Sequence, residues 1–266
     1  MLSRNCLDYL SSDSVREEYL KSKPFPHVIL DEFFDLDLAS QIASEFPDYD
    51  DKSLDLYSNL IEEKRLINHW NKFGAVTYSA FSYLCSNHFV DLVKFLVPDS
   101  SELIPDVGLH GGGLHMHSAG GKLNVHLDYS LHPKLKLQRK LNLLVYLTPD
   151  WDNRWGGSLG LYNNESDSTP GELVKIVEPI FNRAILFDVT QNSWHGLPSK
   201  IKCPEGITRN SIAIYYLQEP DELAQPKRQK ARFAPSPWQI GDVEVLKLIE
   251  KRSGILTSGD VYEDNK

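Results

Sequence analysis

The sequence predicts a mainly β fold with flanking helices, in the α+β class. Strand-like runs of apolar, β-branched and aromatic residues fill the middle of the chain, at 141–147, 184–187 and 209–217. Helical periodicity is found on either side of this region, at 36–46, 80–97 and 242–254. A chain of 266 residues is long enough to bury one large core. We therefore expect a single β-rich domain with helical additions.

The first elements are predicted from prolines and apolar spacing. Residues 1–23 have too few apolar positions for more than a short polar helix or arm. Pro24 and Pro26 block a helix, and residues 27–30, His-Val-Ile-Leu, have strand character. Residues 36–46 carry apolar side chains four apart and are followed by a proline, which predicts an amphipathic helix.

A second helix is predicted over residues 80–97. Its apolar side chains form a stripe that should cover one face of a sheet, made of Leu84, Phe89, Leu92, Val93 and Leu96. The stretch between the two helices, residues 48–71, is charged and is expected to be irregular.

Residues 141–147 alternate as a strand with two different faces. Leu143, Val145 and Leu147 form a wholly apolar face, which we expect to pack on helices. The other face holds Asn142, Leu144 and Tyr146. Tyr146 is therefore expected to point into the interior of the domain.

The structure of the remaining segments is predicted from the positions of glycine, proline and charged residues. Residues 155–162 predict a strand, and 163–172 predict a polar hairpin or flexible loop with Pro170 and Gly171 at its tip. Residues 218–237 are linker-like and locally basic, and could order over a bound substrate. A last helix, DVEVLKLIEKRSG, is expected to end at Gly254, and residues 255–266 to form a frayed tail.

The chemistry centres on His126 and Asp128. Residues two apart on a strand point to the same face, so these two side chains can hold one metal ion. His195 follows the apolar run 184–187 and would lie at the mouth of a later strand. Two histidines and one carboxylate leave coordination positions open, as in non-haem Fe(II) oxygenases. Roughly one His-x-Asp/Glu match is expected by chance in this composition. The evidence for a metal site therefore depends on His195 and on the arginine described next.

Arg209 opens the last strand-like run, 14 residues after His195. A guanidinium there can take a carboxylate in two parallel hydrogen bonds. By strand alternation Ser211 faces the same way and could add a hydroxyl to that carboxylate.

His115 and His117 form a competing histidine pair. A metal site of the cupin type would pair such histidines with a glutamate a few residues further on. Residues 118–122, Ser-Ala-Gly-Gly-Lys, contain no acidic residue. We therefore favour pocket lining or packing for both over iron ligation, with a contact to substrate as a further alternative.

Six segments together resemble the 2-oxoglutarate/Fe(II) dioxygenases of the prolyl-hydroxylase-like group: LNVHLDYS, RKLNLLVYLTPDW, WGGSLGLY, FNRAILFDVT, SWHGLP and CPEGITRNSIAIYYL. The resemblance covers about residues 24–218. It implies a double-stranded β-helix, or jelly-roll, barrel with N-terminal helices packed on one sheet. The chain would then divide into an arm (1–23), the dioxygenase domain (24–218), and a linker, C-terminal helix and tail (219–266).

The resemblance also implies roles for single residues. His126, Asp128 and His195 would bind iron, Arg209 would bind the far carboxylate of 2-oxoglutarate, and Tyr146 would contact the same carboxylate. Ser211 would complete an Arg-x-Ser pattern seen in some oxygenases. The implied cofactors are Fe(II), 2-oxoglutarate and O2, with ascorbate as an optional addition.

The implied activity is hydroxylation of an unactivated C–H bond, with succinate and CO2 as co-products. The substrate would be a prolyl residue of a protein or peptide, or a small amino-acid-like metabolite. A sugar-modifying oxygenase of the same mechanism is an alternative. Two alternatives of another class are a non-redox jelly-roll metal-binding module and a catalytically silent binding module. The second would be marked by a missing ligand or arginine, and none is missing.

Composition limits the partners and the compartment. The net charge of −9 argues against nucleic acid, whose recognition needs a basic face. Three scattered cysteines, Cys6, Cys85 and Cys203, give no disulfide framework. The N-terminus lacks the apolar run of a signal peptide, and no apolar stretch of transmembrane length occurs. We expect a cytoplasmic protein without a membrane partner; the sequence predicts no oligomeric state.

Overall fold

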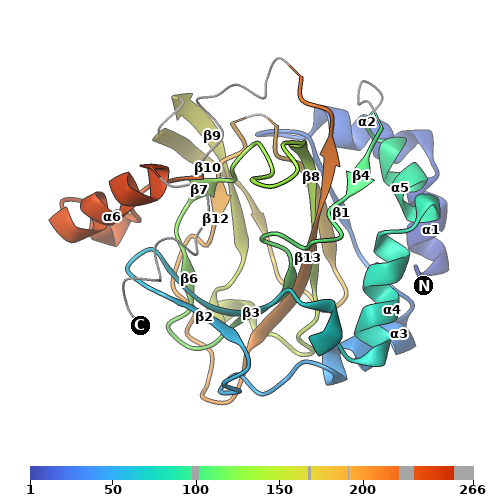
Figure 1. Ribbon diagram of the computed structural model, residues 1–266, viewed down its shortest axis with the longest axis horizontal. Helices are drawn as coiled ribbons and strands as arrows, with labels where there is room; N and C mark the ends of the chain where they lie inside the picture. Colours follow the sequence, from blue (N-terminus) through green and yellow to red (C-terminus); the bar gives the residue numbers. More distant parts are fainter. Residues whose placement is uncertain (98–101, 167–168, 191, 222–230, 255–266) are drawn as a thin grey trace.

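Two antiparallel sheets face each other, with helices on the outside of the larger one (Figure 1). The computed structural model describes residues 1–97, 102–166, 169–190, 192–221 and 231–254. The predicted mainly β fold with flanking helices is thereby confirmed.

The larger sheet has the order β1-β11-β8-β13-β5-β3-β2, with β4 beside β13 and β6 beside β3. Its strands are β1 (His27–Leu30), β2 (Asp55–Ser58), β3 (Glu62–Ile67), β4 (Ile104–Pro105), β5 (Gly113–His117), β6 (Lys122–Leu123), β8 (Gln138–Tyr146), β11 (Ala184–Asp188) and β13 (Arg209–Gln218). The smaller sheet has the order β10-β9-β12-β7-β14. Its strands are β7 (His126–Leu127), β9 (Leu159–Ser166), β10 (Thr169–Val177), β12 (His195–Gly196) and β14 (Arg232–Phe233).

Five helices cover the outer face of the larger sheet, on the right in Figure 1. They are α1 (Arg4–Leu10), α2 (Asp13–Lys21), α3 (Leu36–Ser44), α4 (Ala75–Leu84) and α5 (Asn87–Lys94). A sixth helix, α6 (Val243–Gly254), lies beyond the smaller sheet, where the sequence predicts the last helix. No helix in the described part of the chain is long and apolar enough to cross a bilayer.

The faces of β8 follow the predicted alternation. Leu143, Val145 and Leu147 are buried in the core that contains the helices. Tyr146 belongs to a second core between the sheets, with Leu144 packed against it. Each apolar side chain of this size stabilises the fold by about 1.5–3 kcal/mol when it leaves water. The register of β8, and with it the direction of Tyr146, is therefore strongly specified.

The N-terminal segment is more ordered than predicted. It forms two helices capped by Ser3 and Ser12, whose hydroxyls accept hydrogen bonds from backbone N–H groups of the first turns. Cys6, Leu10, Val15 and Tyr19 are buried in the main core, which explains how so polar a sequence packs.

The single helix predicted over 80–97 is wrong, because the chain forms two helices there. Ser86 interrupts it and caps α5, with its hydroxyl accepting from Phe89 N at 3.4 Å. A serine that caps a new helix competes with continuation of the old one. The apolar stripe still faces the sheet.

The expectation of irregular structure over 48–71 is also wrong. Residues 55–58 and 62–67 pair as β2 and β3, with Tyr57 opposite Lys64. β2 lies at the edge of the sheet. Its side chains are mostly exposed, so the segment lacks the apolar alternation by which a strand is recognised.

Pro170 and Gly171 lie inside β10, not at a hairpin tip, so that prediction is corrected. Pro170 pairs with Asn164, and the register of β10 against β9 is irregular from Thr169 to Lys175. A proline is tolerated here because β10 is an edge strand. Most of the predicted basic linker (222–230) and the tail (255–266) lie outside the described residues.

Candidate active site

Three ligand-type side chains converge where β7 and β12 pair. His126 and His195 are directly opposite each other in the register of these strands, and Asp128 follows β7 immediately. The Nε2 atoms of His126 and His195 lie 3.7 and 3.8 Å from the two Asp128 carboxylate oxygens. These spacings are too long for hydrogen bonds. The ligand atoms all lie within 4.8 Å of one another, close enough to hold one metal ion.

Backbone carbonyls fix the tautomer of both histidines. His126 Nδ1 is 2.9 Å from Asn124 O, and His195 Nδ1 is 2.9 Å from Ser193 O. A carbonyl can only accept, so each Nδ1 carries the proton and each Nε2 presents a lone pair toward Asp128. Burial, with His195 alongside, lowers the pKa of His126 to about 3. This imidazole is therefore neutral at physiological pH, as metal binding requires.

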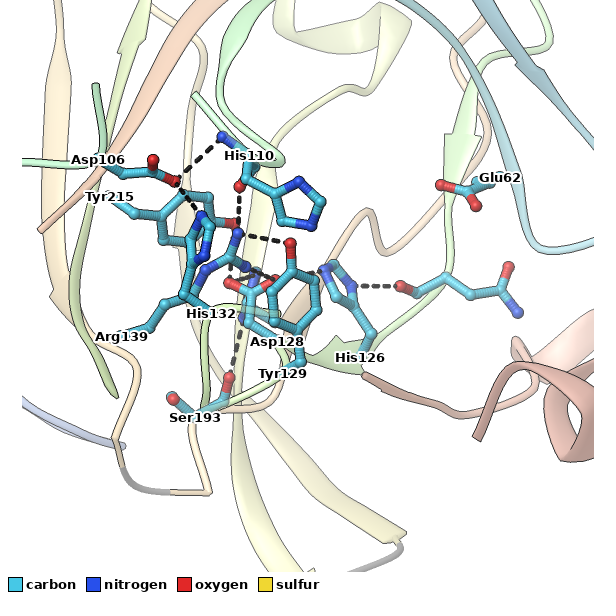
Figure 2. A network of polar contacts seen from close by, with 12 residues as sticks. Glu62, Asp106, His110, His126, Asp128, Tyr129, His132, Arg139, Ser193 and Tyr215 are labelled. Atoms are coloured by element: carbon cyan, nitrogen blue, oxygen red, sulfur yellow. Dashed lines mark hydrogen bonds and ion pairs between the residues drawn. The ribbon is translucent and has the colours of Figure 1, made fainter. Parts of the chain in front are cut away.

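Asp128 is held ionised by its neighbours. Burial alone would raise its pKa, but neighbouring groups outweigh burial and lower it, among them the Arg139 cation and a hydrogen bond from Tyr215. Tyr215 Oη donates to Asp128 Oδ2 at 3.0 Å, and an Arg139 guanidinium nitrogen lies 3.9 Å from Oδ1 (Figure 2). The carboxylate is both charged and fixed in orientation.

Arg139 is clamped between two aromatic rings. Its guanidinium carbon lies 3.8 Å from the ring centroid of Tyr129 and 3.6 Å from that of Tyr215. It donates to Tyr129 Oη at 2.8 Å and to the His110 carbonyl. Stacking on both faces and hydrogen bonds at the edge leave this cation one position, beside the Asp128 carboxylate (Figure 2).

Removing the Tyr215 hydroxyl should loosen Asp128. For Tyr215→Phe we expect metal affinity to fall by roughly tenfold, because a hydrogen bond to a charged group contributes about 1.5–3 kcal/mol. The measurement is equilibrium dialysis with Mn(II) under anaerobic conditions. Tyr216→Phe is the matched control, since Tyr216 Oη donates to Leu84 O, outside the site. Equal metal affinity of Tyr215→Phe and the wild type would show that the hydroxyl does not position Asp128.

The three residues border a cavity of about 420 Å³ between the sheets, and Arg209 and Ser211 line the same cavity. Arg209 is 3% exposed, and its Nε donates to Gly157 O at 2.6 Å. Within the described residues no carboxylate lies within 4 Å of its guanidinium. A buried arginine without an anion is costly, so this wall of the cavity suits an anionic ligand.

Other polar atoms on the same walls also lack partners within the described chain. They are Ser211 Oγ, Asn142 Oδ1, His115 Nε2 and both ring nitrogens of His117. Buried polar groups normally find hydrogen-bond partners. A polar ligand such as 2-oxoglutarate, with two carboxylates and a keto oxygen, fits this wall.

Tyr146 does not line the cavity but lies against Arg209, with the guanidinium 4.8 Å from its ring centroid. It is fully buried. It therefore packs against Arg209 on the side away from the cavity. Its predicted direct contact with a carboxylate stays a prediction.

Gly157 makes room for Arg209. It has φ +79°, and a Cβ there would lie 2.8 Å from Arg209 Cδ. We expect Gly157→Ala to displace the guanidinium and weaken 2-oxoglutarate binding by more than tenfold in an anaerobic titration. Gly156→Ala is the matched control: it has the same φ, but its Cβ would meet Ser199 and Lys200 instead. Equal losses in both variants would assign the effect to backbone strain alone.

His115 and His117 lie on β5, with Ser211 and Arg209 as their partners across β13. Both line the cavity, and neither belongs to the metal-competent group found among the described residues. Burial lowers the pKa of His115 to about 3 and that of His117 well below its usual value. Both are neutral pocket-lining side chains, the reading favoured by the sequence.

These neutral histidines should make folding sensitive to acid. The pKa of His115 falls from 6.5 in the unfolded chain to about 3 in the fold, so below pH 6.5 the unfolded state binds the extra proton. Stability should therefore decrease as the pH falls from 6.5 toward 3, by up to about 1.4 kcal/mol per pH unit for each such histidine. His115→Gln should reduce the slope in urea unfolding of the metal-free protein. The exposed His88→Gln should not, and equal slopes would contradict the account.

Phe233 reaches the site from the C-terminal part of the chain. β14 pairs with β7 so that Phe233 is opposite His126, and the two rings stack with centroids 5.1 Å apart. Together with the edge of Phe187 on His195, it excludes water from the imidazoles.

Two histidines and one carboxylate that leave coordination positions open form the ligand set of non-haem Fe(II) oxygenases. Residues 112–217 match the family model of the 2OG-Fe(II) oxygenase superfamily. This match supports the predicted resemblance to the superfamily and, together with the His-Asp-His group, the expected cofactors iron and 2-oxoglutarate.

Individual relatives are prolyl hydroxylases. The mouse prolyl 3-hydroxylase OGFOD1 is 35% identical over 106 residues, which cover 38% of this chain and 19% of the mouse protein. The Xenopus laevis prolyl 3-hydroxylase OGFOD1 is 37% identical over 78 residues, covering 29% of this chain and 15% of that protein. The match thus spans a fifth or less of the length of these relatives.

Solved structures share the fold. A Pseudomonas putida prolyl-4-hydroxylase superposes with a TM-score of 0.54 at 15% identity, covering 78% of this chain and 98% of that one. A prolyl 4-hydroxylase of Phytophthora capsici gives 0.54 at 17% identity, with 95% and 76% coverage. At this identity the likeness concerns architecture only, and it agrees with the jelly-roll arrangement of two antiparallel sheets.

Proposed function

We propose that the protein is an Fe(II)- and 2-oxoglutarate-dependent dioxygenase that hydroxylates an unactivated C–H bond. The observation that carries the proposal is the convergence of His126, Asp128 and His195 on one cavity that also contains Arg209. A metal held by three protein ligands keeps open positions for a chelating co-substrate and for O2. When bound, iron and 2-oxoglutarate supply the oxidation, with succinate and CO2 as co-products.

The protein's part is binding, orientation and exclusion of water. His126 offers a neutral imidazole nitrogen and His195 offers the Nε2 atom opposite it, and Asp128 offers a charge held in place by Tyr215 and Arg139. Arg209 takes the far carboxylate of 2-oxoglutarate, with Ser211 beside it and Tyr146 behind it. This anchor aims the keto acid at the metal, because one end of the molecule is fixed at a guanidinium that cannot turn away.

For the substrate we propose a prolyl residue of a protein or peptide. The prolyl hydroxylases among the sequence relatives support this choice. The second candidate is a small amino-acid-like metabolite, and a cavity of about 420 Å³ suits either a single side chain or a small molecule beside 2-oxoglutarate. We also propose that residues 24–218 form the dioxygenase domain, which carries all the proposed metal and 2-oxoglutarate ligands, while Phe233 is contributed from outside it.

The test is turnover with product analysis. The protein is incubated with Fe(II), 2-oxoglutarate, O2 and a panel of prolyl peptides, free amino acids and sugars, with and without ascorbate. We expect succinate, and a gain of one oxygen atom in one substrate. Failure to form succinate from the iron-loaded protein would contradict an oxygenase and leave a metal-binding module. A product from the sugar arm would replace the prolyl assignment.

A further inference from the structure

The walls of the cavity are strongly cationic, although the whole chain has a net charge of −9. The charged side chains that line it in the described structure are five cations and two carboxylates: Lys64, Lys134, Arg139, Arg209 and Arg252, with Glu62 and Asp128. A positive cavity in an acidic protein concentrates anions and disfavours cations.

Binding of iron and 2-oxoglutarate would not neutralise all of these cations. On the proposed function, the metal dication, the co-substrate dianion, Asp128 and Arg209 neutralise one another. Arg139 is fixed between its two tyrosines and cannot follow a ligand. Lys134 is an exposed residue at the mouth. Two interior cations, Lys64 and Arg252, remain.

Lys64 and Arg252 share a single carboxylate. Lys64 Nζ is 3.5 Å from one Glu62 oxygen, and an Arg252 guanidinium nitrogen is 3.6 Å from the other. Both separations exceed the roughly 2.7–3.2 Å of a good N–H···O hydrogen bond. Arg252 Nε is buried without a hydrogen-bond partner. The two cations therefore carry one more positive charge than Glu62 neutralises, and they have N–H donors for a second anion.

The position of Arg252 is set by packing. α6 is anchored by buried Val245, which clusters with Ile61 and Phe233, and Gln239 donates to Leu60 O at 2.6 Å. The guanidinium then lies over the Phe233 ring, 5.2 Å from its centroid. In Figure 2, Glu62, the carboxylate that Lys64 and Arg252 share, lies on the opposite side of His126 from Arg139.

We propose that Lys64 and Arg252 form a second anion subsite, which binds a carboxylate of the substrate while the metal faces the carbon to be hydroxylated. The inference rests on the proposed function and names the substrate class: a molecule with an acidic group close to the reacting carbon. Both residues lie outside residues 112–217, the part of the chain that matches the family model. An acidic side chain of a peptide and a small free acid offer the same chemistry.

Peptide binding to the loaded protein tests the proposal. The protein is loaded anaerobically with Mn(II) and 2-oxoglutarate, and loading is verified by metal and co-substrate stoichiometry. Three prolyl peptides that differ only in flanking Glu, Gln or Lys, and free L-glutamate, are then titrated by calorimetry. We expect the Glu peptide to bind at least tenfold more tightly than the Gln peptide, the Lys peptide to bind most weakly, and the preference to shrink with added salt. If free L-glutamate binds with an affinity similar to that of the Glu peptide, the carboxylate bound at the subsite belongs to a small free acid.

Arg252→Gln should reduce the Glu-over-Gln preference to less than threefold, and Lys64→Gln supplies the same test if the first variant does not fold. Lys247→Gln is the matched control on α6, where Lys247 pairs with Glu244 at the surface, and it should keep the full preference. Equal binding of the acidic and neutral ligands, or an undiminished preference in both subsite variants, would overturn the subsite. Failure to load Mn(II) and 2-oxoglutarate would instead overturn the proposed function, so the two failures are distinguishable.

Discussion

Single replacements of His126, Asp128 or His195 by alanine are expected to abolish metal binding and all turnover. Each removes one of three ligands from a site that has no fourth ligand-type side chain among the described residues. Two remaining ligands hold a divalent ion far more weakly. The measurement is Mn(II) stoichiometry after anaerobic dialysis, read together with succinate formation from Fe(II)-loaded protein.

His115→Gln and His117→Gln are the matched controls, because these histidines line the same cavity and formed the competing pair in the sequence. We expect both to retain one metal ion per chain. Loss of the metal in either control, with retention in His126→Ala, would move the site to β5 and contradict the assignment.

The second large effect is expected for Arg209→Gln. A charged hydrogen-bonding contact of this kind contributes about 1.5–3 kcal/mol, so we expect the dissociation constant for 2-oxoglutarate to rise at least tenfold. Metal binding should persist, because Arg209 is no ligand. Arg209→Lys should rescue only part of the affinity, since an ammonium cannot form the paired hydrogen bonds of a guanidinium.

Anaerobic titration of the Mn(II)-loaded protein with 2-oxoglutarate measures this effect. Arg183→Gln is the matched control, an arginine that pairs with Asp31 on the surface. Equal affinity of Arg209→Gln and the wild type would show that the co-substrate carboxylate binds elsewhere.

The fold was predictable where the two faces of an element meet different surroundings. The alternation in 141–147 assigned the correct face to Leu143 and Tyr146, because that strand lies between a helix-covered core and an inner core. The edge strand β2 was not predictable, since its side chains are mostly exposed and impose no pattern. The break at Ser86 was missed because the apolar stripe continues across it.

The candidate site was only partly predictable for a related reason. His126, Asp128, His195 and Arg209 follow from spacing and resemblance, but Arg139 was missed. Strict alternation from Leu141 places Arg139 on the helix-facing side. The register of β8 against β13 shifts by one residue at Lys140, and this bulge turns Arg139 into the cavity.

Tyr215 and Phe233 were missed for different reasons. Tyr215 shares its face with Arg209, so strand alternation signalled its direction, but only the fold reveals that its hydroxyl reaches Asp128. Phe233 lies in a segment that reads as a linker, and it reaches His126 only because β14 pairs with β7.

The most direct test of the account is a crystal structure of the protein soaked anaerobically with Mn(II) and 2-oxoglutarate. We predict one anomalous peak bonded to His126 Nε2, Asp128 and His195 Nε2. The keto acid should chelate this metal, with its far carboxylate paired to Arg209. A metal bound by His115 and His117, or 2-oxoglutarate that makes no contact with Arg209, would contradict the central claim.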